Sequence, residues 1–192
     1  MKTEFECRFL DIDINKVREK LAAAGFICIQ PETLQHRATF DLPEKDGAIR
    51  WLRLRDEGSG KTTLTLKIKN KGVKNVASLG EVEVGVASFD DMLEILNAAG
   101  HITASHEENL REKWTRDDIE VCLDTWPGLN PFCEIESDTA DKVQRAAEEL
   151  GFDWRAAHFG NVVEVYEQVL GLSLAEFQTC CNFKNPPKSK LS

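Results

Sequence analysis

Charged residues at alternate positions open the chain and could bind a metal ion. In MKTEFECRF, Glu4, Glu6 and Arg8 alternate with Phe5 and Cys7. Successive side chains of an extended strand point to opposite faces, so the three charged residues share one face. Carboxylate oxygens are preferred ligands of hard cations such as Mg²⁺. For a single short stretch, however, the commoner explanation is an antiparallel strand with a solvated outer face.

The same alternation recurs along the chain, with bases on some segments and acids on others. Basic pairs occur in IRWLRLR, KTTLTLKIK and NLREKW, and acidic pairs in GEVEV and FCEIES. The residues concerned are Arg53, Arg55, Lys67, Lys69, Arg111, Lys113, Glu81, Glu83, Glu134 and Glu136, and IEVCLD adds Asp124 at its end. At least seven strands therefore carry charge on one side. Strands of a single sign indicate a site that binds an anion through metal ions, because a solvated face normally mixes both signs.

Helical segments between these strands indicate where the charged faces point. Apolar residues at helical spacing predict helices in INKVREKLAAAG, FDDMLEILNAAG and TADKVQRAAEELG, each of which ends at a glycine. Amphipathic helices cover apolar surface, which here is the apolar side of the strands. The charged sides then face water as an open sheet or one another inside a barrel. Closure removes unpaired edges and leaves room for one small ligand, and the segregated signs favour it.

Composition limits the partners that are expected. The 192 residues carry a formal net charge of -9, which argues against a general binder of nucleic acid or of anionic membranes. The six cysteines lack zinc-ligand spacing and are interpreted as reduced thiols of a cytoplasmic protein. No apolar run approaches the roughly 18 residues of a membrane span, and the charged N-terminus lacks the apolar segment of a signal peptide. Neither export nor membrane insertion is expected.

In their order and spacing, the charged residues resemble the CYTH superfamily of triphosphate tunnel metalloenzymes, which includes class IV adenylyl cyclases and thiamine triphosphatases. The matches are Glu4, Glu6 and Arg8 for the opening E-x-E-x-K, Arg53 and Arg55 for R-L-R, Lys67 for the lysine of T-L-x-K, Arg111 three residues before Trp114, Asp124 at the end of the L-D strand, Glu134 and Glu136 for the closing E-x-E, and Tyr166 with Glu167 in the terminal helix. The resemblance covers roughly residues 1–175. It implies an α+β fold, in which an eight-stranded antiparallel barrel forms a triphosphate tunnel and helices pack outside. The tunnel domain is expected over residues 1–178, with a flexible C-terminal tail over residues 179–192.

The resemblance also implies roles for individual residues. The expected triphosphate ligands are Arg8, Arg53, Arg55, Lys67 and Arg111, and the expected catalytic residues are Arg8, Lys67 and Lys113. The expected ligands of Mg²⁺ or Mn²⁺ are Glu4, Glu6, Asp124, Glu134 and Glu136, and Glu81 and Glu83 either bind metal indirectly or orient the arginines. Arg8 departs from the family, which prefers lysine there, and arginine cannot reproduce lysine's proton chemistry.

Three functions remain open at this stage. The first is metal-dependent hydrolysis of an inorganic or organic triphosphate, such as tripolyphosphate, thiamine triphosphate or ATP, because no segment is recognisable as a reader of a nucleobase. The second is an adenylyl cyclase that converts ATP to cyclic AMP and pyrophosphate. The third is a non-catalytic module that binds polyphosphate or nucleotide, in a monomer or a homodimer. The four histidines are interpreted as surface or core residues. The tryptophans Trp51, Trp114, Trp126 and Trp154 fit packing beneath the helices better than a stacking platform.

Overall fold

The computed structural model describes the backbone of residues 2–70 and 77–191, and the side chains of these residues except 2–4, 70, 77–79 and 180. Its strands are β1 (Lys2–Phe9), β2 (Ile27–Lys45), β3 (Ala48–Asp56), β4 (Thr62–Asn70), β5 (Ala77–Val86), β6 (Ser105–Arg116), β7 (Ile119–Thr125) and β8 (Phe132–Ser137). Its α-helices are α1 (Ile14–Ala23), α2 (Phe89–Ala98), α3 (Ala140–Glu149), α4 (Val162–Leu170) and α5 (Leu174–Cys180), and Trp154–Ala156 form one 3₁₀ turn.

The eight strands form a closed antiparallel barrel in the order β1-β5-β4-β3-β2-β6-β7-β8. Strand β1 closes the ring by pairing with two different neighbours. Its first half, Lys2–Phe5, pairs with β5, and its second half, Phe5–Phe9, pairs with β8. The register shifts between Glu4 and Phe5, where the strand changes partner. The expected α+β fold with an eight-stranded antiparallel barrel is confirmed.

The two faces of each strand differ as the sequence pattern predicts. On β3, Leu54 is fully buried in a cluster with Phe40 of β2 and Leu96 of α2. The alternate residues Arg53 and Arg55 point instead into the barrel, where they line a cavity. A period of two residues per strand therefore separates an outer apolar face, covered by helices, from an inner charged face.

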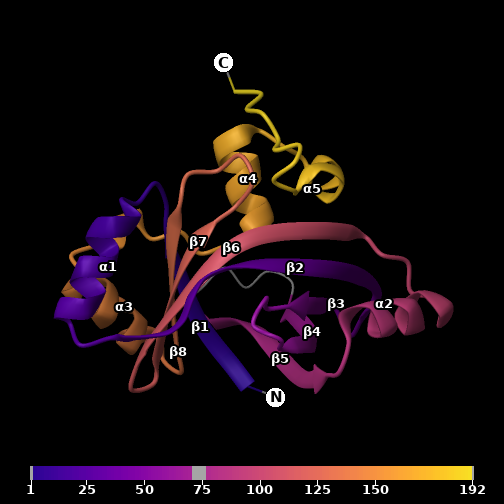
Figure 1. Cartoon of the computed structure of the whole chain (residues 1–192), viewed down its shortest axis with the longest axis horizontal. Helices are drawn as coiled ribbons and strands as arrows, with labels where there is room; N and C mark the ends of the chain where they lie inside the picture. Colours follow the sequence, from indigo (N-terminus) through magenta and orange to yellow (C-terminus); the bar gives the residue numbers. More distant parts are fainter. Residues whose placement is uncertain (1, 71–76, 192) are drawn as a thin grey trace.

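The three helices that the sequence predicts cover the outside of the barrel (Figure 1). Helices α1 and α3 lie together on one side and share a core with β1, β7 and β8, to which Cys7, Leu21 and Val143 contribute. Helix α2 packs on β3 at the opposite side. Each of the three begins at a capping residue whose side chain accepts a backbone hydrogen bond, which satisfies an otherwise unpaired amide.

Helices α4 and α5 pack against each other over one end of the barrel (Figure 1). The fully buried Tyr166 of α4 donates a hydrogen bond of 2.6 Å from its hydroxyl to the carbonyl of Pro127. Its ring lies 5.0 Å from Phe177 of α5 and 6.4 Å from Trp126, centroid to centroid. Gly171 ends α4 in the left-handed conformation, at φ 69°. This aromatic cluster fixes both helices on the barrel.

The segment after α5 makes several contacts with the rest of the chain. Cys181 is fully buried, and its carbonyl accepts a hydrogen bond of 2.9 Å from the amide of Glu108 on β6. The amide of Lys190 donates to the carbonyl of Leu170, at 2.8 Å. The domain boundary at residue 178 and the flexibility of the tail stay predictions. Within the described ranges, no helix has the length and apolar character needed to cross a membrane.

Candidate functional site

The barrel encloses a cavity of about 830 Å³. All eight strands contribute side chains to its wall, so the cavity is the lumen of the barrel. Most of the predicted site residues line it, namely Glu6, Arg8, Arg53, Arg55, Lys67, Glu81, Glu83, Arg111, Lys113, Glu134 and Glu136. Two do not fit this description. The side chain of Glu4 lies outside the described residues, and Asp124 is not part of the cavity wall.

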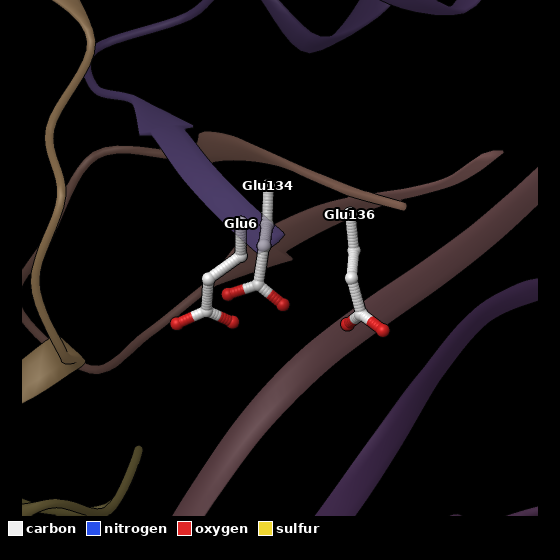
Figure 2. Close-up of side chains that lie close together, drawn as sticks. All are labelled: Glu6, Glu134 and Glu136. Carbon is white, nitrogen blue, oxygen red and sulfur yellow. The ribbon is translucent and has the colours of Figure 1, made fainter. Parts of the chain in front are cut away.

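Three carboxylates converge where β1 meets β8. Glu6, Glu134 and Glu136 each offer an oxygen, and these oxygens lie within 4.8 Å of one another (Figure 2). The strand register explains the cluster, because Glu6 pairs directly with Glu136 and Glu134 lies two residues earlier on β8. Carboxylates at such distances repel one another unless a cation lies between or beside them. Their hard oxygens fit a divalent cation such as Mg²⁺ or Mn²⁺.

Arg8 lies beside this carboxylate cluster and is already engaged by it. Its guanidinium forms ion pairs with Glu134 at 2.5 Å and with Glu6 at 3.2 Å, and it also donates to the carbonyl of Gly160 before α4. Burial alone would lower the pKa of Arg8, but Glu134 and Glu6 outweigh it and raise the pKa. The planar fork of arginine makes these three contacts at once, which a single lysine nitrogen could not do in the same geometry. The catalytic role expected of Arg8 stays a prediction.

Asp124 stands behind Arg111 and not in the carboxylate cluster. Its fully buried carboxylate accepts two hydrogen bonds from Arg111, at 2.7 and 2.5 Å, and one of 3.0 Å from Asn109. Arg111 also contacts Glu134 at 3.0 Å. A bidentate pair of this kind fixes the guanidinium plane. In this position Asp124 orients Arg111, and its predicted role as a metal ligand gains no support from the geometry.

The acidic pair of β5 faces the basic residues of β4 and β3. Glu81 pairs with Lys67 at 3.0 Å, and Glu83 accepts a hydrogen bond of 2.8 Å from the hydroxyl of Thr65 and lies 3.7 Å from Arg55. The β4–β5 register places Lys67 opposite Glu81 and Thr65 opposite Glu83. Of the two alternatives that the sequence left open, this geometry corresponds to the orientation of basic residues.

Two arginines of the lumen, the buried Arg37 and the partly buried Arg53, have no carboxylate partner among the described residues. Arg53 and Arg37 form no ion pair there, and the Nε atom of each is buried without a hydrogen-bond partner. Burial, followed by repulsion from neighbouring arginines, lowers the pKa of Arg37 to about 9 and that of Arg53 to about 10. An anion bound in the lumen would accept hydrogen bonds from these positively charged groups and offset the repulsion between them.

Sequence analysis missed Arg37. It lies on β2, within QHRATFD, where Gln35, Arg37 and Thr39 alternate with apolar Ala38 and Phe40. This is the same alternation that identified the other strands, so the signal was present. The strand is 19 residues long, however, and its register with β6 shifts twice before Thr33, which hides the period over its first third.

Part of the lumen wall is apolar, and much of it comes from outside the strands. Val162 and Val163 of α4 and Leu174 and Phe177 of α5 line the cavity. Trp126 also lines it, with the guanidinium carbon of Arg37 4.8 Å from its ring. Trp51 of β3 faces the same cavity. Trp126 also packs beneath α4 and α5, as expected, in the cluster with Tyr166 and Phe177. For Trp51 the expectation of packing beneath the helices is wrong, because β3 alternation turns it inward with Arg53.

Comparisons with known proteins agree with this architecture. Residues 2–156 match the family model of the CYTH domain. A proposed adenylate cyclase of Methanocaldococcus jannaschii is 31% identical over 142 residues, which cover 72% of this chain and 78% of the relative.

Solved structures show the same fold at low identity. A protein of Pyrococcus horikoshii has a TM-score of 0.70 at 19% identity, and the match covers 84% of this chain and 98% of that one. A proposed adenylate cyclase of Vibrio parahaemolyticus has a TM-score of 0.70 at 12% identity, with 89% and 99% covered. A Hippeastrum protein, described as a proposed adenylyl cyclase with a dominant triphosphatase activity, has a TM-score of 0.53 at 17% identity, with 91% and 99% covered.

Proposed function

The chain belongs to the CYTH family, and on that premise we propose that it is a divalent-metal-dependent triphosphatase, which binds a triphosphate in the barrel lumen and cleaves a phosphoanhydride bond. One observation carries the proposal. Next to a cluster of three carboxylates, the lumen holds Arg37 and Arg53, which form no ion pair among the described residues and whose Nε atoms are buried without a partner. A triphosphate with bound metal ions matches this arrangement, since it brings negative charge to the arginines and positive charge to the carboxylates.

The basic residues would hold the phosphate oxygens. A triphosphate carries about four negative charges near neutral pH. Arg37, Arg53, Arg55 and Arg111 present guanidinium groups to the lumen from three different strands, and such forks suit bidentate contacts to phosphate. Lys67 adds a compact charge. Donors that are already in place when the lumen is empty need little reorganisation as charge develops on the transferred phosphoryl group.

The carboxylate cluster would hold the metal. Glu6, Glu134 and Glu136 supply hard oxygen ligands within reach of one ion, and Glu4 stays a predicted fourth ligand. Bound Mg²⁺ or Mn²⁺ would neutralise phosphate charge and polarise an oxygen nucleophile. Arg8 would act as a positioning residue in this scheme, since its contacts to Glu6 and Glu134 hold two of the ligands in place.

A second candidate keeps the same site and adds an organic group to the triphosphate, as in an adenylyl cyclase. The apolar wall formed by Val162, Val163, Leu174 and Phe177 favours it. Tripolyphosphate has about 13 non-hydrogen atoms, which fill roughly 400 Å³ at the 30 Å³ that a liquid water occupies. The cavity of about 830 Å³ leaves room for metal-bound waters and for a further group beside that wall. The names of the M. jannaschii relative and of the Hippeastrum neighbour agree with cyclase and triphosphatase chemistry respectively.

One set of assays separates these candidates. Phosphate release is measured on tripolyphosphate, thiamine triphosphate and ATP, each with Mg²⁺ and with Mn²⁺, and ATP reactions are also analysed by chromatography for cyclic AMP. We expect metal-dependent phosphate release and its loss when EDTA is added. Cyclic AMP with pyrophosphate as the main products would favour the cyclase. Calorimetric binding of the same ligands without any product would contradict both reactions and support a binding module.

A further inference from the structure

A buried carboxylate, that of Glu57, lies behind the basic wall of the lumen, which is defined here as Arg55, Lys61 and Lys113. Glu57 follows β3 and is 2% exposed, yet it is not part of the cavity wall. Three cations that do line the cavity contact it. Its Oε1 lies 3.1 Å from Arg55 Nη2 and 3.3 Å from Lys61 Nζ, and its Oε2 lies 3.5 Å from Lys113 Nζ.

The backbone holds Glu57 in this position independently of its side chain. Its amide donates to the carbonyl of Lys61 at 2.9 Å, and its carbonyl accepts from Gln30 of β2 at 3.4 Å. The next residue, Gly58, has φ +71°, and a Cβ atom there would lie 2.3 Å from the carbonyl oxygen of Leu34. The turn therefore packs tightly against β2, and this fixes the backbone position from which the Glu57 side chain extends.

The three cations reach Glu57 from three different segments. Arg55 belongs to β3, Lys61 precedes β4, and Lys113 belongs to β6. Burial would raise the pKa of Glu57, but Arg55, Lys113 and Lys61 outweigh it and lower the pKa. The carboxylate is thus a shared counter-ion. Without it, like charges would repel one another, and the long lysine side chains would gain rotamer freedom.

We propose that Glu57 is the positioning residue of the basic wall, which holds Lys113 and Lys61 toward the lumen so that they meet a phosphate group already oriented. This inference rests on the proposed function. Glu57 is expected to affect the orientation of the cations and the affinity for an anion in opposite directions. Its negative charge weakens the attraction of an anion, whereas its ion pairs fix where the cations lie. Its removal is therefore expected to slow turnover without weakening binding.

The test uses Glu57→Gln, which removes the charge and keeps the shape. For hydrolysis of tripolyphosphate, we expect kcat to fall by about 10–100-fold, the range seen when an outer partner of a functional group is lost. We expect KM to stay constant or to fall, because the lumen becomes more positive. Glu57→Asp keeps the charge on a side chain one methylene shorter and should restore part of kcat.

Glu112→Gln is the matched control. Glu112 is also a buried carboxylate, at 5% exposed, but it binds Arg18 of α1 and Trp114 on the outside of the barrel. A loss of stability alone should appear in this variant without a change in kcat or KM per folded molecule. If Glu57→Gln behaves like Glu112→Gln, or if its KM rises while kcat is kept, the positioning role is overturned.

A second measurement does not depend on turnover. Acylation of lysine amines is followed residue by residue with mass spectrometry, in the wild type and in Glu57→Gln. Lys61 and Lys113 should react faster in the variant, while Lys67, which pairs with Glu81, should react at the wild-type rate. Equal rates at Lys61 and Lys113 in both proteins would overturn the inference. A wild type without any triphosphate turnover would refute the proposed function, and the acylation rates would still decide the role of Glu57.

Discussion

The charged residues of the lumen differ in what they contact, and this difference separates their roles. Glu134 contacts both Arg8 and Arg111, at 2.5 and 3.0 Å, and these cations outweigh the effect of burial and lower its pKa. It is therefore part of an ion-pair network as well as of the carboxylate cluster. Glu136 belongs to the cluster and is more exposed. Glu134 is thus tied to neighbouring cations, whereas Glu136 is the more accessible carboxylate of the cluster.

Replacement of Glu136 tests metal binding with little disturbance of the fold. Glu136→Gln should reduce affinity for Mn²⁺ by about 10–100-fold or more, because an amide oxygen is a weaker ligand than a carboxylate. Calorimetric titration with Mn²⁺ measures this directly, and phosphate release should fall in parallel. The exposed Glu19 of α1 supplies the control variant Glu19→Gln. Unchanged Mn²⁺ affinity in Glu136→Gln would argue against the metal assignment.

The lowered pKa of Glu57 predicts how the free energy of unfolding depends on pH. Its pKa is lowered in the folded protein, so its stabilising effect is complete above its unfolded value of about 4.5 and is lost as pH falls below it. Glu57→Gln should lower the free energy of unfolding by about 1–3 kcal/mol at pH 7, since three cations lose a partner. The difference from wild type should shrink between pH 5 and about pH 3. Denaturation by urea at several pH values measures it, and a difference independent of pH would contradict the assigned ion pairs.

At the scale of elements, alternation predicts most of the barrel because its physical cause is local. Seven of the eight strands show a period of two over their whole charged stretch, and this identified them and the side of each that carries the charge. Strand β2 was not identified, because register shifts near Gln30 interrupt its period. The roles of Glu57 and of α5 were also missed. A turn glutamate and a distant helix reach the lumen only through tertiary packing, which leaves no periodic trace in the sequence.

Helix α5 provides a test of substrate choice. Leu174 is 54% exposed and lies on the apolar part of the lumen wall. If that wall binds an organic group, Leu174→Asp should reduce kcat/KM for ATP or thiamine triphosphate by roughly 10-fold, equivalent to about 1.4 kcal/mol, and leave tripolyphosphate nearly unchanged. Ile95→Asp is the matched control, since Ile95 is 58% exposed on α2 and away from the cavity wall. Equal losses for all three substrates would exclude a separate subsite for the organic group.

At the scale of the whole molecule, the chain gathers charged side chains of both signs inside the barrel. Its formal net charge is -9, yet acidic and basic side chains of the described residues line the lumen in equal number. The net negative charge therefore lies outside the lumen, where it disfavours extended polyanions, whereas arginines inside the barrel are available to a small anion that can enter it. The closed barrel makes this possible, because strand alternation directs one set of side chains inward around the whole ring.

The two arginines of the lumen without an ion pair among the described residues, Arg37 and Arg53, predict how ligand binding changes stability. Without a bound anion, Arg37 and Arg53 lie near other arginines, and this repulsion lowers the stability of the folded state. Tripolyphosphate with Mg²⁺ at about 100 times Kd should add roughly 2.7 kcal/mol. For a domain of this size, the melting temperature should then rise by several degrees, at about 2–4 °C per kcal/mol.

Arg53→Ala distinguishes a charged lumen from an ordinary charged surface. Without ligand, the variant should be as stable as the wild type or slightly more stable, because it relieves repulsion among buried arginines. With Mg²⁺ and tripolyphosphate, it should lose much of the rise in melting temperature. Arg145→Ala on α3, away from the cavity wall, serves as the control and should keep the full rise. Thermal melts of the three proteins with and without ligand measure both effects. A wild-type melt that does not respond to Mg²⁺-tripolyphosphate would refute the lumen as a triphosphate site, because a ligand that binds only the folded state must stabilise it.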